Sequence, residues 1–111
     1  MQLTMRGIVI NAGCAPEIRN VPTTAQGIDA FLGGRLGNYS QMVPFSTKPA
    51  ALIYVPQRPG MEALPTRRYA GRWYYGRLLI VGFRGCRMQP LTEALARDLA
   101  KHFTPVEVSR L

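Results

Sequence analysis

Arginine and aromatic side chains are concentrated together in residues 67–77 of this sequence. Arginine binds phosphate through paired hydrogen bonds and stacks on nucleobases, while exposed Tyr and Trp rings stack on bases of any identity. A contact surface for a phosphate-bearing partner is therefore predicted from Arg67, Arg68, Arg72, Trp73, Tyr75 and Arg77. The alternative is that Trp73 and Tyr75 pack in the core while the arginines extend outward from it.

Residues suited to catalysis are sparse in this chain. The single histidine, His102, lies near the end of a predicted helix, where a partly solvated position favoured by the helix dipole explains it without any catalytic role. The carboxylates show no paired spacing, and Cys14 has no evident base that would activate it. No glycine-rich phosphate loop or dinucleotide motif occurs. We therefore expect a protein that is not an enzyme, with no metal site and no cofactor.

The excess positive charge lies mostly in one segment. The net charge is +8, from 14 basic and 6 acidic residues. Residues 63–92 contain six arginines and no acid, which leaves 14 − 6 = 8 bases against 6 acids elsewhere. A concentrated basic surface attracts phosphate-rich partners over long distances. The alternative is a solvated basic face with no partner.

The size and composition of the chain favour a single folded domain over residues 1–111, with residues 104–111 as a frayed tail. A chain of 111 residues, 47% of them hydrophobic, can bury one modest core. No apolar run approaches the roughly 20 residues that cross a bilayer, and the N-terminus lacks a signal-peptide pattern. We expect a cytoplasmic protein with no membrane partner. Cys14 and Cys86 are expected to be free thiols.

Short apolar runs bounded by Pro and Gly predict the strands of the fold. The expected strands are residues 5–12, 17–21, 38–45, 50–55 and 78–83. The first two would form a hairpin, and Gly82 indicates a bulge or close packing against a neighbour. A surface loop is expected between Pro56 and Pro65. Residues 66–75 fit either a helical turn or an irregular edge strand, and residues 106–108 fit an edge strand or a tail.

Two helices are expected, at residues 23–32 and 91–103. Thr23 and Gln26 have the spacing of a capping box, and the glycine pair at 33–34 would end the first helix. Thr92 would cap the second helix, whose apolar stripe is Leu95, Leu99 and Phe103. This order of elements predicts an α+β domain: a mostly antiparallel sheet of about four to six strands, with both helices packed on one face.

Several short segments resemble the domain-of-unknown-function 3846 family, small uncharacterised proteins of phages, plasmids and their bacterial hosts. The similar segments are Pro16-Glu17, Gly33-Gly34, residues 52–55 (LIYV), Leu64-Pro65 with Arg67, residues 79–82 (LIVG) and Leu91-Thr92. The chain departs from the pattern at residues 57–59, where members carry acidic or amide side chains. The resemblance implies a small α+β accessory protein of a mobile element and supplies no catalytic residues.

Two functional hypotheses follow. The first is a non-enzymatic accessory protein of a mobile element or phage, whose basic aromatic surface contacts nucleic acid or a nucleotide. The second is a protein-interaction or homodimerisation module, for example one that binds a host defence protein. The two differ in salt dependence, because phosphate binding weakens steeply as salt rises and apolar association does not.

Overall fold

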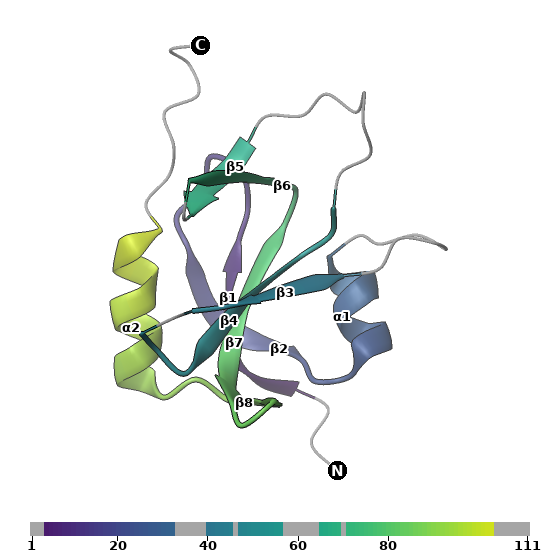
Figure 1. The fold of residues 1–111 in the computed structure, drawn as a ribbon, viewed down its shortest axis with the longest axis vertical. Coiled ribbons are helices and arrows are strands. Elements are labelled where there is room, and N and C mark those ends of the chain that lie inside the picture. The colour runs from purple at the N-terminus through teal and green to yellow at the C-terminus, as the bar shows by residue number, and fades with distance from the viewer. Residues whose placement is uncertain (1–3, 33–39, 46, 57–64, 70, 104–111) are drawn as a thin grey trace.

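A computed structural model of the protein describes residues 4–32, 40–45, 47–56, 65–69 and 71–103. The centre of the fold is an antiparallel sheet. Its strands are β1 (Thr4–Ile10), β2 (Glu17–Pro22), β3 (Gln41–Pro44), β4 (Ala50–Tyr54), β7 (Leu78–Arg84) and β8 (Arg87–Gln89). They lie in the order β2-β1-β7-β4-β3, and β8 pairs with the end of β7. Two helices flank this sheet, and a separate hairpin lies at one end of it (Figure 1).

The three middle strands are apolar on both faces. Paired residues point to the same side of a sheet, so Ile80 of β7 shares one face with Ile8 of β1 and Leu52 of β4. On the other face, Leu79 lies between Val9 and Ile53 in the same way. All six of these side chains are buried. The sheet therefore has two separate hydrophobic cores, one on each side.

The two helices cover opposite faces of the central sheet. Helix α1 (Ala25–Phe31) packs Ile28 into the core that contains Leu79, whereas α2 (Glu93–His102) packs Leu99 into the core that contains Ile80. Figure 1 shows the strands between the two helices. The α+β class and the antiparallel sheet are as predicted, but the placement of both helices on one face is wrong. Strands that are apolar on both sides need a covering layer on both sides.

The helix N-termini follow the predicted chemistry with one shift in register. Thr92 caps α2 as expected, and its hydroxyl accepts a hydrogen bond from the Leu95 N–H at 3.2 Å. Helix α1 is capped by Thr24 rather than Thr23, through a 3.0 Å bond from the Gly27 N–H. Adjacent threonines offer the same capping hydroxyl, so the sequence pattern alone does not choose between them.

The ambiguous residues 66–75 form a two-stranded hairpin, β5 (Pro65–Tyr69) and β6 (Arg72–Tyr75), that is separate from the central sheet. Gly71 in its turn has a φ of 78°, a left-handed conformation that glycine adopts without strain. In Figure 1 the hairpin crosses one end of the molecule, and β8 lies at the opposite end. The hairpin contributes Tyr74 to the core on the α2 side of the sheet.

Strand β8 is the element that the sequence did not predict. A Cβ at Gly82 would lie 2.5 Å from the Gln89 carbonyl oxygen, so the predicted close packing at Gly82 is confirmed and β8 is its cause.

Cys14 and Cys86 are free and exposed. In the described residues, no helix is long and apolar enough to cross a membrane. The glycine pair at 33–34, most of the predicted loop (57–64) and the predicted tail (104–111) lie outside the described residues.

Candidate functional site

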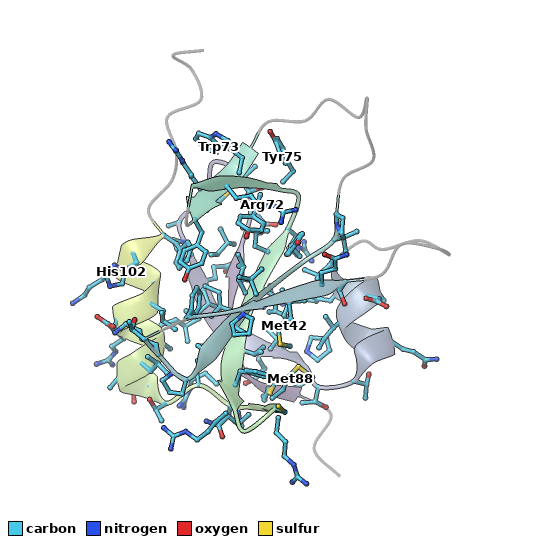
Figure 2. The ribbon with its side chains drawn as sticks, in the orientation of Figure 1. Met42, Arg72, Trp73, Tyr75, Met88 and His102 are labelled. Atoms are coloured by element: carbon cyan, nitrogen blue, oxygen red, sulfur yellow. The ribbon has the colours of Figure 1, made fainter. Side chains whose placement is uncertain are left out.

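The β5–β6 hairpin has two faces with different surroundings. The register pairs Arg67 with Tyr74 and Arg68 with Trp73, and side chains alternate along each strand. The inner face, turned toward the central sheet, carries Arg67, Tyr69, Arg72 and Tyr74. The outer face carries Arg68, Trp73 and Tyr75. Figure 2 shows Trp73 and Tyr75 directed away from the body of the protein, with Arg72 on the opposite side of β6.

Arg67 is buried, with 2% of its surface exposed, and this corrects its predicted place in the contact surface. Its Nε donates to the Phe103 carbonyl at 2.9 Å, its Nη1 to the Thr66 carbonyl at 2.6 Å, and its Nη2 to the Cys14 carbonyl. Burial lowers the pKa of the guanidinium from its usual value. Arg67 therefore joins the hairpin, the C-terminus of α2 and the loop after β1.

Arg68 and Trp73 are exposed neighbours on the outer face of the hairpin. The guanidinium carbon of Arg68 lies 5.6 Å from the centroid of the Trp73 ring, in cation–π contact. Trp73 remains 42% exposed, which is unusual for so large an apolar ring. Among the described residues, no carboxylate pairs with Arg68. An unpaired cation and an open aromatic ring therefore stand together in solvent.

Arg72 and Tyr75 extend this surface along β6. The Arg72 guanidinium carbon lies 5.5 Å from the ring centroids of both Tyr54 and Tyr74, and the side chain stays exposed. A small cavity of about 170 Å³ opens here, lined by Arg72, Trp73 and Tyr75 together with Tyr54. We give the name hairpin surface to the exposed residues Arg68, Arg72 and Trp73 together with the partly buried Tyr75.

Arg77 lies outside the hairpin surface, although the sequence predicted it as part of the same site. Its Nε donates to Asn11 Oδ1 and its Nη1 to the Phe31 carbonyl, both at 3.1 Å. Its guanidinium carbon also lies 4.9 Å from the centroid of the Phe31 ring. Phe31 ends α1, so Arg77 binds the C-terminus of that helix, where a cation is favoured.

Two buried tyrosines that the sequence analysis did not single out, Tyr54 and Tyr74, pack against Arg72 of the hairpin surface. The rings of Tyr54 and Tyr74 meet edge to face, with centroids 4.8 Å apart. Both are buried, and burial raises the pKa of the Tyr74 hydroxyl. The Tyr54 hydroxyl donates to Gln41 Oε1 at 3.0 Å. Tyr74 lies within the aromatic segment, but Tyr54 is 20 residues away in sequence, so no local pattern would have associated the two.

No acidic side chain in the described part of the chain forms an ion pair with Arg68 or Arg72. Ion pairs in the described part of the chain involve α2: Arg97 with Glu93, and Asp98 with both Lys48 and His102. Lys48 Nζ lies 2.5 Å from Asp98 Oδ2, and this hydrogen bond lowers the pKa of the Asp98 carboxyl. In the described residues no group of three His, Cys, Asp or Glu side chains could hold a metal ion.

Comparison with known proteins found no relative of this chain. No family model, no curated protein and no solved structure matches the chain. The resemblance to the domain-of-unknown-function 3846 family therefore stays a prediction from short motifs.

Proposed function

We propose that this protein is a non-enzymatic binding protein whose hairpin surface contacts a phosphate-bearing partner, with single-stranded nucleic acid as the preferred class. The observation that carries the proposal is the contact between Arg68 and the exposed ring of Trp73. A guanidinium on an open aromatic ring offers one group for a phosphate and another for a base. An accessory role in a phage or other mobile element is proposed from the sequence resemblance.

The arginines and aromatic rings of the hairpin suit single-stranded nucleic acid more than a duplex. Arg68 and Arg72 would neutralise backbone phosphates, while Trp73 and Tyr75 would stack on bases whose faces are open only in single strands. Neither ring selects a particular base, so the expected binding tolerates many sequences. Because two arginines carry the phosphate contacts, affinity should fall as salt rises.

The test compares two double variants in a fluorescence anisotropy titration with a labelled single-stranded oligonucleotide. Arg68→Ala with Arg72→Ala should weaken binding by about tenfold or more and flatten the log–log salt slope by about 1.4, two phosphate contacts at 0.7 each. The matched control is Arg84→Ala with Arg87→Ala, which removes the same charge from exposed residues at the β7–β8 end. Equal losses in both variants would mean that the binding is only a response to net charge.

A protein-interaction module is the second candidate, and exposed apolar side chains favour it. Ile18 is 41% exposed on β2, which lies at one edge of the central sheet. Edge strands with exposed apolar residues can pair with another chain, here a second copy or a host protein. Self-association through this edge should persist at high salt, and Ile18→Lys should abolish it. Light scattering after size exclusion would measure it, and a monomer at every concentration would count against a homodimer.

A further inference from the structure

A second cavity opens between the hairpin, α2 and the residues that connect β3 to β4. Its volume is about 310 Å³, at the lower end of the range for small-molecule sites. Three aromatic rings and three basic side chains line most of it: Phe45, Tyr69 and Phe103, with Lys48, Arg68 and His102. It shares only Arg68 with the hairpin surface, and it has no lining residue in common with the cavity beside Arg72.

The aromatic side of this cavity is a connected cluster. Phe45 and Tyr69 meet edge to face with centroids 5.0 Å apart, and each lies 6.1 Å from the Phe103 ring. Phe103 is almost fully buried, whereas Phe45 and Tyr69 are partly exposed. These rings are therefore held in place by packing and still present surface to the cavity. A planar aromatic group can pack against such a wall with little reorganisation.

The rim of the cavity has an excess of positive charge. Lys48 and Arg68 contribute +2 and the neighbouring Asp98 contributes −1, which gives +1 with His102 neutral and +2 with His102 protonated. Asp98 accepts from Lys48, but an ammonium has three N–H donors and keeps others for a ligand. Arg68 has no carboxylate partner among the described residues. Two cationic side chains, Lys48 and Arg68, are therefore available at the rim for one anion.

We propose that this cavity binds the phosphomonoester of a single nucleotide, with the base against the aromatic wall and the phosphate at Lys48, Arg68 and His102. A phosphomonoester carries a charge of about −1.5 to −2 at neutral pH, against −1 for a phosphate within a strand. The cavity volume of about 310 Å³ suits a single nucleotide. This chemistry is shared by a free nucleoside monophosphate and by the 5′-phosphorylated end of a strand. The site shares Arg68 with the hairpin surface but does not use Arg72, Trp73 or Tyr75.

The experiment is a heteronuclear NMR titration of the unmodified protein with adenosine 5′-monophosphate, adenosine and inorganic phosphate. The nucleotide should shift the amide signals of Thr47, Tyr69 and His102, and should bind at least about tenfold more tightly than adenosine or phosphate alone. Equal affinity for adenosine would overturn the role of the cationic rim. Shifts confined to residues outside the cavity would overturn the site.

A second arm distinguishes the two sources of the phosphate. Oligonucleotides with a 5′-phosphate and with a 5′-hydroxyl are compared in competition with the free nucleotide. Preference for the phosphorylated strand assigns the cavity to strand ends, and equal binding of both strands with retained affinity for the mononucleotide assigns it to the free nucleotide. If neither the mononucleotide nor the 5′-phosphate is preferred, the proposal is wrong.

Matched lysine variants test the rim. Lys48→Gln should weaken mononucleotide binding by about tenfold, because one charge-assisted hydrogen bond is lost. Lys101→Gln removes the same charge from an exposed residue of α2 that does not line the cavity, and should leave binding unchanged. Equal effects of the two variants would overturn the proposal. Trp73→Ala should not change mononucleotide affinity, although it should weaken binding of a single-stranded oligonucleotide to the hairpin surface. The two proposals can therefore be refuted separately.

Discussion

The inner and outer faces of the β5–β6 hairpin carry similar residue types in opposite surroundings. On the inner face Arg67 is buried and donates to three backbone carbonyls. On the outer face its neighbour Arg68 is exposed, has no carboxylate partner among the described residues, and lies over the ring of Trp73. The same contrast separates the buried ring of Tyr74 from the exposed ring of Trp73.

This contrast separates stability from binding within a single pair of strands. Alternation along a strand directs consecutive side chains to opposite faces, so a basic aromatic segment divides into a structural half and a candidate binding half. Substitutions of the buried inner-face residues Arg67 and Tyr74 should therefore change the free energy of unfolding. Substitutions of the exposed residues, which include Arg72 at the open end of the inner face, should change affinity. Each of the following experiments tests whether stability and binding are separated in this way.

The largest expected effect is the loss of stability on replacing Arg67. Arg67→Met keeps much of the side-chain volume but leaves three carbonyls without their donor, which should reduce the free energy of unfolding by about 3 kcal/mol. Arg68→Met is the control, and the change there should stay within about 0.5 kcal/mol. Urea denaturation followed by circular dichroism measures both. Similar losses in the two variants would show that the hairpin faces are not energetically distinct.

A smaller effect is expected when the exposed indole is removed. Trp73→Ala should weaken binding of a single-stranded oligonucleotide by about 1–3 kcal/mol, the usual contribution of one base–aromatic stack, with little change in melting temperature. Ile18→Ala removes an equally exposed apolar side chain from β2 and should not alter affinity. If Trp73→Ala lowers the melting temperature and leaves affinity unchanged, the outer face is structural after all.

The smallest effect concerns the ion pair between Lys48 and Asp98, where the residues before β4 meet α2. The hydrogen bond from Lys48 holds the pKa of Asp98 below 3.8, so its stabilising contribution is present above that pH and is lost as the pH falls through the lowered pKa. Lys48→Met should therefore be less stable than the natural protein at neutral pH, and the difference should shrink at about pH 3. Urea denaturation at both pH values checks this. A difference that does not change with pH would contradict the assignment.

Local sequence patterns predicted the elements whose packing is repetitive. Apolar runs identified the middle strands, and the stripe with Leu99 and Phe103 identified α2 together with its cap, Thr92. The patterns did not predict β8, since three residues give no period, and they left the β5–β6 segment undecided. They also grouped Arg67 and Arg77 with the exposed arginines, because residue type carries no information on burial.

The sequence by itself determined the fold class, the antiparallel strands and the concentration of arginine and aromatic residues in one segment. Those features depend on hydrophobic period and composition, which are local. Only the tertiary structure decided which side of the sheet each helix covers, that Arg67 is buried beside Phe103, and that Lys48 and His102 meet Arg68 around one cavity. These outcomes depend on contacts between residues far apart in sequence, and no local pattern specifies them.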